Sequence, residues 1–243
     1  MTAPTLRLIT HASTATGRAQ MALDALLLAR AAERGISSCR WYQWSGPTVS
    51  LGYFQTGLPA ELQARFVGLP VVRRLTGGGA SLHHHELTYS LALAAAHPLC
   101  VDPRQLYDRV HEAVIGALRR QGVAVGLRGA GRPELGENYL CFARGDSFDV
   151  VCEGFKVLGS AQRRRRGAVL QHGSLLWARS AWAPEFPGIC DLADVKVDAE
   201  RLQSSLREVL VEALGGEFDE EAELPADELS RFGELEREFG DPC

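Results

Sequence analysis

The segment FDVVCEGFKVLGSA, residues 148–161, contains two apolar runs that are joined by the dipeptide Glu153-Gly154. A two-residue connection that ends in glycine is typical of a tight hairpin between antiparallel strands. We therefore expect strands over Phe148–Cys152 and Phe155–Ala161. A further apolar run, Val169–Trp177, predicts that a third strand follows the hairpin.

Similar short runs occur upstream of this hairpin. We expect strands over Leu6–Thr10, Arg40–Trp44, Thr48–Phe54, Val71–Leu75 and Leu87–Leu93, with a turn at Ser45-Gly46-Pro47. Apolar residues at helical spacing predict two helices, Gln20–Arg34 before Gly35, and Pro103–Gln121 between the caps Asp102 and Gly122. Because the strands come in hairpin-like pairs and few helices separate them, we expect an α+β fold. Its sheet should be mixed and largely antiparallel, with packed helices, rather than doubly wound.

The composition is that of a globular protein of enzyme size. The chain has 243 residues, of which 46% are hydrophobic, and a formal net charge of −4. It has no basic excess that would indicate nucleic acid as a partner. The N-terminus up to Thr16 has no signal-peptide pattern, and the apolar stretch Met21–Ala32 is too short to span a bilayer. These features predict a cytoplasmic protein that binds neither nucleic acid nor membranes.

The six cysteines are scattered through the chain without a CxxC pair: Cys39, Cys100, Cys141, Cys152, Cys190 and Cys243. This spacing favours free thiols over a disulfide framework and predicts no metal site. After Asp198 the sequence becomes helical and charged, so we expect a catalytic domain over residues 1–198 and a small helical extension over 199–243. Within the extension, the acidic stretch Glu217–Glu223 is predicted to be a solvated connection.

The first candidate site is the loop Arg73-Arg74-Leu75-Thr76-Gly77-Gly78-Gly79-Ala80, which follows a predicted strand. Three successive glycines let a ligand approach the backbone, whose amide groups then bind phosphate or carbonyl oxygens. The spacing matches neither a P-loop nor a dinucleotide-binding motif. From the residues alone, a ligand-binding loop and a flexible loop are equally good interpretations.

Two single residues are candidates for chemistry. Lys156 lies among apolar and small residues just after the predicted turn, where it suits a fixed cation for a carbonyl or phosphate group. The alternative is an edge-strand lysine that discourages aggregation. Cys141, considered alone, is better interpreted as a small buried hydrophobe than as a nucleophile.

Two polar clusters complete the candidates. In an extended segment His83 and His85 would share a face, but without a third ligand they suit the mouth of a site better than a metal centre. The run Arg163–Arg166 is interpreted as a solvated basic turn, and it also suits attraction of an acidic protein partner.

Taken together, several motifs resemble the superfamily of lipoate-protein ligases A, octanoyltransferases and biotin ligases, in the order typical of that superfamily. The motifs are Gln20–Asp24, Val49–Gln55, Arg73–Ala80, Glu86–Ser90, Gly154–Gln162 and Gln171–Ser174. In addition, Leu140-Cys141-Phe142 resembles the nucleophile segment of the Bacillus-type octanoyltransferases. The resemblance implies a biotin/lipoate protein ligase-like catalytic domain, with the acyl chain in an apolar tunnel beneath the glycine-rich loop.

The resemblance also implies residue roles. Cys141 would be the nucleophile, and Lys156 would orient the acyl carbonyl and assist proton transfer. No metal is implied for this chemistry. The implied substrate-binding residues are Arg74, Gly77, Gly78, Gly79, His83, Gly159, Ser160, Ala161, His172 and Gly173.

Three functions remain open at this point. The first is octanoyl transfer from octanoyl-acyl carrier protein through Cys141 to a lysine of a lipoyl domain or of glycine-cleavage H protein, without a cofactor. The second is an ATP- and Mg²⁺-dependent lipoate-protein ligase. Gly79 is typical of the ligases, whereas the Bacillus-type transferases usually have Arg at this position. The third is an acyl-binding protein that has kept the fold without the activity.

Overall fold

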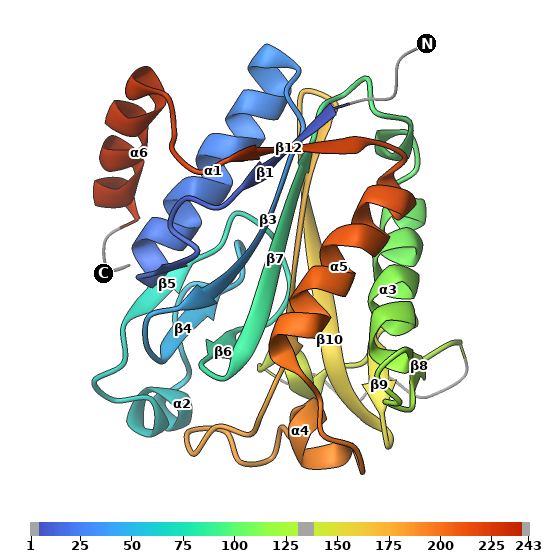
Figure 1. Cartoon of the computed structure of the whole chain (residues 1–243). Coiled ribbons are helices and arrows are strands. Elements are labelled where there is room, and N and C mark those ends of the chain that lie inside the picture. Colours follow the sequence, from blue (N-terminus) through green and yellow to red (C-terminus); the bar gives the residue numbers. More distant parts are fainter. Residues whose placement is uncertain (1–4, 131–138, 240–243) are drawn as a thin grey trace.

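The computed structural model of the chain describes residues 5–130 and 139–239. The strands of its large sheet are β1 (Thr5–Ile9), β2 (Thr14–Ala15), β3 (Ser38–Trp44), β7 (Glu86–Leu93), β8 (Val125–Leu127), β9 (Val150–Cys152), β10 (Phe155–Arg165), β11 (Ala168–Leu176) and β12 (Glu217–Glu221). They lie in the order β12-β1-β3-β7-β11-β10-β9-β8, with β2 beside β3 (Figure 1). Pairing is parallel at β12-β1-β3 and antiparallel from β3 to β8. The predicted α+β fold with a mixed, largely antiparallel sheet is confirmed.

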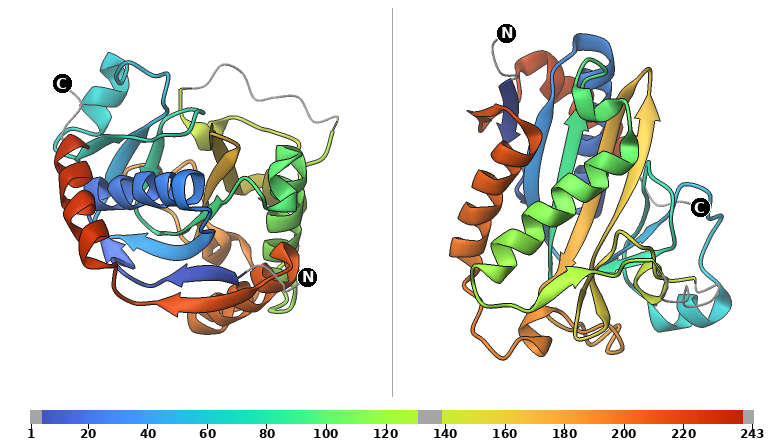
Figure 2. Two further views of the ribbon diagram at one scale, coloured as in Figure 1. Left: turned by 90° about the horizontal axis from the view of Figure 1, so that it is seen from above. Right: turned by 90° about the vertical axis from the view of Figure 1, so that its right-hand side faces the viewer.

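Helices cover both faces of this sheet. The α-helices of the described residues are α1 (Gly17–Arg34), α2 (Ala60–Arg65), α3 (Pro103–Arg119), α4 (Ile189–Leu192), α5 (Ala199–Leu214) and α6 (Ala226–Glu238), with a short 3₁₀ turn η1 (Pro98–Cys100). Helix α1 packs on one face with α6 beside it, and α3 and α5 pack together on the other face (Figure 2). Strand β7 serves both cores, because Leu91 and Leu93 join the α3–α5 side while Ala92 joins the α1 side. No helix within the described residues is long and apolar enough to cross a membrane.

Strands β9 and β10 form the predicted hairpin. Both residues of the turn, Glu153 and Gly154, have positive φ angles of 48° and 83°, which a two-residue turn of this kind requires. The register of β10 against β9 then shifts between Lys156 and Leu158. Such a bulge bends a strand locally and changes the direction of a side chain, here next to Lys156.

A second, smaller sheet carries the glycine-rich loop. Its strands are β4 (Thr48–Leu51), β5 (Val71–Arg73) and β6 (Ser81–His83), in the order β5-β4-β6. The two strands predicted on either side of Ser45-Gly46-Pro47 are β3 and β4, and they lie in different sheets. All four residues of β4 are buried, and β4 satisfies its backbone by pairing parallel with β5 and antiparallel with β6. The loop from β5 to β6 consequently lies over the side of the large sheet that carries α1.

The acidic stretch Glu217–Glu223 was expected to be a solvated connection, and this prediction is wrong. Residues 217–221 are strand β12, which pairs parallel with β1. Glu221 binds the buried Arg30 of α1 with both carboxylate oxygens, at 2.9 and 2.6 Å, so its charge is compensated inside the fold. The division of the chain at residue 198 stays a prediction. Any such extension is joined to the preceding part through the sheet.

A buried ion pair fixes α1 to the centre of the sheet. Arg40 on β3 binds Asp24 Oδ1 through Nη2 at 2.6 Å and Nε at 3.1 Å, and both side chains are at most 2% exposed. Gln20 binds the same guanidinium through its side-chain oxygen at 2.5 Å. Burial raises the pKa of Asp24, but Arg40 and His172 lower it further than burial raises it, so the net shift is downward.

Replacement of Asp24 by Asn is expected to lower the free energy of unfolding by about 3 kcal/mol, because Arg40 would stay buried without a carboxylate. Since the folded pKa of Asp24 is lowered, the pair contributes stability above the unfolded pKa and loses it as pH falls through the folded value. In urea unfolding, the difference in free energy of unfolding between the wild type and Asp24→Asn should therefore become smaller as the pH falls from 7 toward 3. The exposed pair Arg7–Asp219 is the control, and Asp219→Asn should cost less than about 1 kcal/mol. Equal losses of unfolding free energy in Asp24→Asn and Asp219→Asn would contradict the claim that burial makes the Arg40–Asp24 pair more important for stability.

Candidate active site

The described cysteines differ in accessibility, and all are free thiols. Cys39, Cys100 and Cys152 are buried, Cys190 is exposed, and Cys141 is half-buried. Burial raises the pKa of Cys39 to about 12, which leaves it almost without thiolate at neutral pH. Cys243 lies outside the described residues. Among the described cysteines, Cys141 lines the cavities beneath the glycine-rich loop.

Cys141 begins a short 3₁₀ helix, η2 (Cys141–Ala143), which the glycine-rich loop holds in place. Ala80 N donates to Tyr139 O at 2.9 Å, and Cys141 N donates to Ala80 O at 2.7 Å. A Cβ atom added to Gly79 would lie only 2.7 Å from Tyr139 O and 3.0 Å from Cys141 N. Gly79 therefore allows the loop to lie directly against the cysteine.

Lys156 on β10 reaches the same point from fifteen residues further along the chain. Its Nζ atom lies 3.9 Å from Cys141 Sγ and 3.4 Å from the backbone oxygen of Cys141. The ammonium also pairs with Asp149 Oδ1 at 3.0 Å, and the two side chains of this pair are 7% and 5% exposed. Burial raises the pKa of Asp149, an effect that Lys156 opposes. The two predicted catalytic residues are thus brought together.

Gly159 explains how a strand lysine reaches sideways. A Cβ atom at position 159 would lie 2.3 Å from Lys156 Cε and 2.7 Å from its Nζ. The Lys156 side chain therefore folds across its own strand over Gly159 instead of extending into solvent. The Lys-x-x-Gly spacing is thus a packing requirement.

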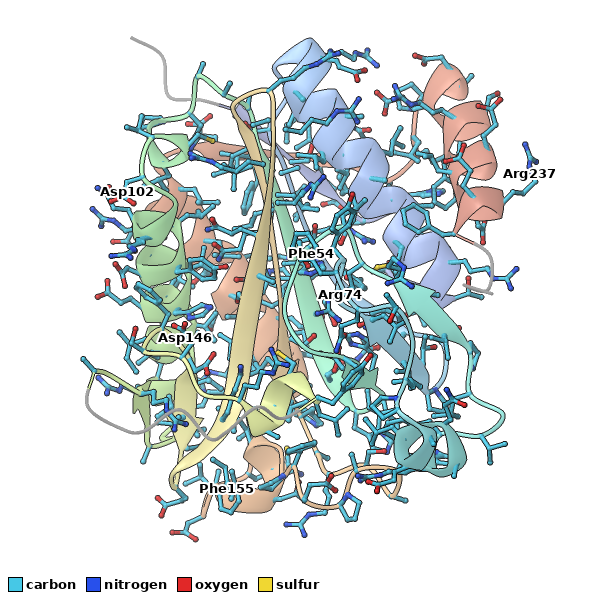
Figure 3. The ribbon with its side chains drawn as sticks, turned by 180° about the vertical axis from the view of Figure 1, so that it is seen from behind. Phe54, Arg74, Asp102, Asp146, Phe155 and Arg237 are labelled. Atoms are coloured by element: carbon cyan, nitrogen blue, oxygen red, sulfur yellow. The ribbon has the colours of Figure 1, made fainter. Side chains whose placement is uncertain are left out.

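Arg74 lies inside the glycine-rich loop (Figure 3). Its guanidinium donates to the backbone oxygens of Gly77 and Gly79 at 3.0 and 2.8 Å, and to the backbone oxygen of Ser50 at 2.9 Å. Burial lowers the pKa of Arg74. The structure therefore uses Arg74 to set the loop conformation, and its contact with a substrate stays a prediction.

His83 and His172 are held by buried hydrogen bonds beneath this loop. His172 Nε2 bonds Thr76 Oγ1 at 2.5 Å, and its Nδ1 bonds Asp24 Oδ2 at 3.1 Å. Burial lowers the pKa of His172, while Asp24 opposes this shift. His83 Nδ1 bonds Glu86 Oε1 at 2.6 Å. The motif residues of α1, the loop and the sheet thus form one polar layer under the site.

An inner cavity lies between this layer and Cys141. Met21, Tyr42, Trp44 and Phe142 give it apolar walls, which fits the expected acyl tunnel. Most of the predicted substrate-binding residues line it, namely Arg74, Gly78, His83, Gly159, Ser160, Ala161, His172 and Gly173. Gly79 lines the adjoining outer chamber, and Gly77 lines neither space.

The outer chamber is wider and more polar. It shares Gly78, Cys141 and Ser160 with the inner cavity, so the two spaces meet at the cysteine. Its other walls include Arg104, Tyr107, His111, Arg144, Asp149 and Lys156. This arrangement lets an apolar chain lie on one side of Cys141 while a second reactant approaches from the other side.

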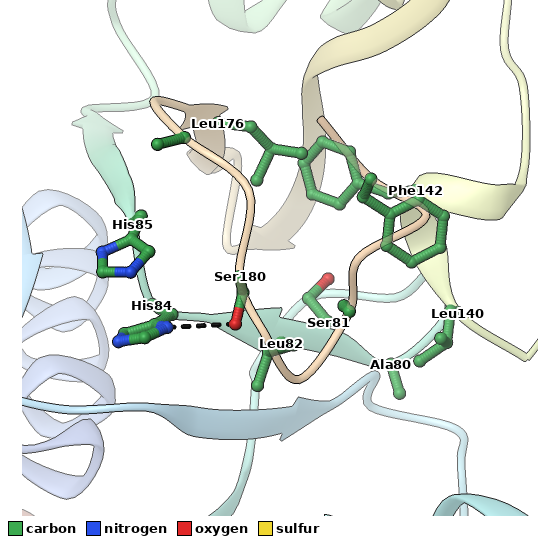
Figure 4. Close-up of a pocket in the computed structure, with 12 residues that line it drawn as sticks. Ala80, Ser81, Leu82, His84, His85, Leu140, Phe142, Leu176 and Ser180 are labelled. Carbon is green, nitrogen blue, oxygen red and sulfur yellow. Dashed lines mark hydrogen bonds between the residues drawn. The ribbon is translucent and has the colours of Figure 1, made fainter. Parts of the chain in front are cut away.

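The histidine cluster is divided between the site and the surface. Strand β6 ends at His83, and the chain turns at His84 and His85, whose rings stack at 3.6 Å. His83 and His85 therefore do not lie in one extended segment. His84 bonds Ser180 Oγ at 3.0 Å beside a separate pocket, which Phe142 helps to line (Figure 4). Residues 5–130 and 139–239 contain no group of three or more side chains arranged to hold a metal.

The run Arg163–Arg166 lies toward the opposite end of β10 from Lys156. Lys156 and Arg165 are nine positions apart on β10, which corresponds to roughly 30 Å of strand. Arg165 pairs with Glu33 at 2.8 Å, and Arg163 lies over the Tyr53 ring at 4.4 Å. A role of this run in attracting an acidic partner stays a prediction, and it would act over a distance.

Sequence reasoning missed Asp149, the carboxylate partner of Lys156. A signal was present, because Asp149 is the one acid inside the otherwise apolar run Phe148–Cys152. It also missed His111, which is 1% exposed on α3. A histidine beside Val110 and Val114 on the buried face of an amphipathic helix is the corresponding signal for that position.

The sequence model of the protein family described as the lipoyl protein ligase A/B catalytic domain matches residues 16–210 of the chain. The chain belongs to this family. Octanoyltransferase LipM of Moorella thermoacetica is 42% identical to this lipoyl protein ligase A/B domain over 64% of the chain and 59% of the relative. Octanoyltransferase LipM of Kyrpidia tusciae is 32% identical over 93% of both chains. The chain thus spans about three fifths of the first relative and nearly all of the second.

Solved structures show the same fold. A putative lipoate protein ligase from T. acidophilum with bound lipoic acid has a TM-score of 0.71, covering 98% of this chain and 96% of that one. A lipoate-protein ligase A bound with ATP has a TM-score of 0.72, covering 98% and 95%. Both are 22% identical to the lipoyl protein ligase A/B domain described here, so they support the fold alone.

Replacement of Gly79 by Ala is expected to destabilise the domain by about 1–3 kcal/mol, because the new methyl group overlaps the backbone of Tyr139 and Cys141. Gly77→Ala is the matched control, since the nearest atom to its added Cβ is a Phe54 carbon at 4.0 Å. We expect this control to change stability by less than about 0.5 kcal/mol. Urea unfolding measures both effects, and similar values for the two variants would contradict the close approach of the loop to Cys141.

Proposed function

We propose that this lipoyl protein ligase A/B domain is a protein octanoyltransferase that works through a thioester on Cys141. The observation that carries the proposal is the 3.9 Å contact between Cys141 Sγ and Lys156 Nζ where the two cavities meet. The relatives named octanoyltransferase LipM support the same activity at 32% and 42% identity.

In the first half-reaction the Cys141 thiolate attacks the carbonyl carbon of octanoyl-acyl carrier protein. A new bond forms between carbon and Cys141 Sγ, the bond to the carrier sulfur breaks, and the carrier leaves as a thiol after protonation. Lys156 stabilises the negative charge that moves from sulfur to the carbonyl oxygen and then to the leaving sulfur. The octanoyl chain lies in the apolar inner cavity.

In the second half-reaction a lysine amine of a lipoyl domain or of glycine-cleavage H protein attacks the Cys141 thioester. An amide bond forms, the carbon–sulfur bond breaks, and the proton lost by the amine passes to the departing sulfur, which regenerates the Cys141 thiol. These two half-reactions need no ATP, metal or other cofactor. A reactive free thiol is maintained in a reducing compartment, which supports a cytoplasmic location.

The cysteine–lysine contact favours this reaction over an ATP-dependent ligase. A ligase activates free lipoate with ATP and Mg²⁺ as an adenylate, and that chemistry uses the lysine but requires no thiol. A thiol beside a buried ammonium would then have no function. Fold likeness to a ligase bound with ATP does not separate the two reactions.

The test is intact-mass measurement after incubation with octanoyl-acyl carrier protein and no ATP. The wild type should gain one octanoyl group, which hydroxylamine should remove. Cys141→Ala should gain none, whereas Cys190→Ser, a variant of the exposed cysteine, should react like the wild type. If modification requires ATP and free lipoate and persists in Cys141→Ala, the protein is a ligase and the transferase proposal is wrong.

Lys156→Met is expected to slow formation of this adduct by about 10²–10³-fold, because it removes the cation next to the developing charge. The chain offers a matched control, since Lys196 is its only other lysine and is exposed. Lys196→Met should form the adduct at the wild-type rate. Quenched time courses followed by mass spectrometry compare adduct formation in the wild type and the two variants. Equal rates in all three would show that Lys156 has no role in the first half-reaction.

A further inference from the structure

A chain of buried hydrogen bonds continues from β10 into the fold behind the cysteine–lysine pair. Gln171 Nε2 donates to Tyr89 Oη at 2.7 Å, and Tyr89 Oη lies 2.7 Å from Ser160 Oγ. Ser160 Oγ lies 2.6 Å from His111 Nε2. His111 Nδ1 lies 2.5 Å from the backbone oxygen of Phe148. Tyr89 and His111 are at most 1% exposed, so water does not compete for these bonds.

The direction of each hydrogen bond in this chain is fixed. The backbone oxygen of Phe148 only accepts, so His111 carries its proton on Nδ1. Burial lowers the pKa of His111 to about 4, and the ring is therefore neutral at neutral pH, with Nε2 as an acceptor. Ser160 must then donate its proton to Nε2. Tyr89, whose pKa burial raises, keeps its proton and donates it to Ser160 Oγ.

Ser160 consequently offers a ligand one lone pair and no proton. Its hydroxyl has one hydrogen and two lone pairs. The hydrogen is directed to His111, and one lone pair accepts from Tyr89. Ser160 lines both cavities together with Cys141, so the remaining lone pair is the group that it can present to reactants.

The two reactants, the acyl thioester and the attacking amine, need different hydrogen-bond partners. The carbonyl oxygen of an acyl thioester only accepts hydrogen bonds, so it cannot form one with Ser160, whose proton is directed to His111. Its donor is Lys156, whose ammonium lies next to Cys141 Sγ. The attacking amine of a lysine carries N–H groups and needs an acceptor. A serine prepared as a pure acceptor, in a wall shared by both cavities, fits the amine.

We propose that Ser160 binds the amine of the acceptor lysine as it attacks the Cys141 thioester, and that His111 is the positioning residue that holds Ser160 in its accepting state. This inference rests on the octanoyl transfer proposed above and concerns its second half-reaction. A hydrogen bond from the amine to Ser160 Oγ fixes the nitrogen and directs its free electron pair to the carbonyl carbon. Ser160 forms no covalent bond, so the first half-reaction does not use it.

The test resolves the two half-reactions. The octanoyl adduct is formed from octanoyl-acyl carrier protein, isolated, and mixed with a lipoyl domain, and its decay is followed by intact mass. Ser160→Ala should form the adduct within about threefold of the wild-type rate and lose about 10²-fold in transfer, the loss expected when a reactant is misplaced. The loss should appear in the maximal transfer rate, while the lipoyl-domain concentration at half-maximal rate stays unchanged.

His111→Asn provides an independent test. Its amide keeps a donor for the backbone oxygen of Phe148 but does not reach Ser160, so transfer should slow while adduct formation is preserved. Ser147→Ala is the matched control, because Ser147 is an exposed serine next to Phe148 and lines neither cavity. It should behave as the wild type in both steps.

Three outcomes decide the inference. Slow transfer with normal adduct formation in Ser160→Ala and His111→Asn supports it, and hydroxylamine should still cleave both adducts at the wild-type rate. Unchanged transfer, or equal slowing of both steps, overturns it while leaving the proposed function intact. A wild-type protein that forms no adduct would instead overturn the octanoyl transfer itself.

Discussion

The Lys156 ammonium lies 3.9 Å from the Cys141 sulfur because two positions of the chain carry no side chain. At Gly159 the lysine folds across its own strand, and at Gly79 the loop lies against the backbone of the cysteine segment. A Cβ atom at either glycine would occupy space that the site needs. The chemistry of the site therefore depends on close packing as much as on the reactive groups.

A buried ammonium also has to be compensated, since the removal of one charge from water costs several kcal/mol. Asp149 at 3.0 Å supplies the opposite charge, and the backbone oxygen of Cys141 supplies an acceptor. The same principle recurs beneath the site, where Asp24 pairs with Arg40 and binds His172. Asp24 thereby joins α1 to β3 through Arg40 and to β11 through His172, and His172 bonds Thr76 of the loop.

Much of this architecture was predictable from local sequence. The Glu153-Gly154 turn, the caps Gly35 and Asp102 and the period of the apolar runs are local signals, and the structure confirms them. The predicted cap Gly122 is wrong, because α3 ends at Arg119 with Arg120 as its C-cap. The pairing of β4 and the placement of β12 were not predictable in this way, because both depend on contacts between distant segments. For the site, the family motifs indicated Cys141 and Lys156. Asp149, which pairs with Lys156, and His111, which bonds Ser160, required the three-dimensional structure, since nothing in their spacing links them to these partners.

The contact between sulfur and amine can be measured directly by cross-linking with o-phthalaldehyde, which joins an adjacent thiol and primary amine into a fluorescent isoindole. The chain is well suited to this measurement, because Lys156 and Lys196 are its only lysines. One equivalent of reagent should produce isoindole fluorescence, and peptide mapping should find Cys141 linked to Lys156. A link that involves Lys196, or alkylation of Cys141 without any isoindole, would contradict the contact from which the mechanism is derived.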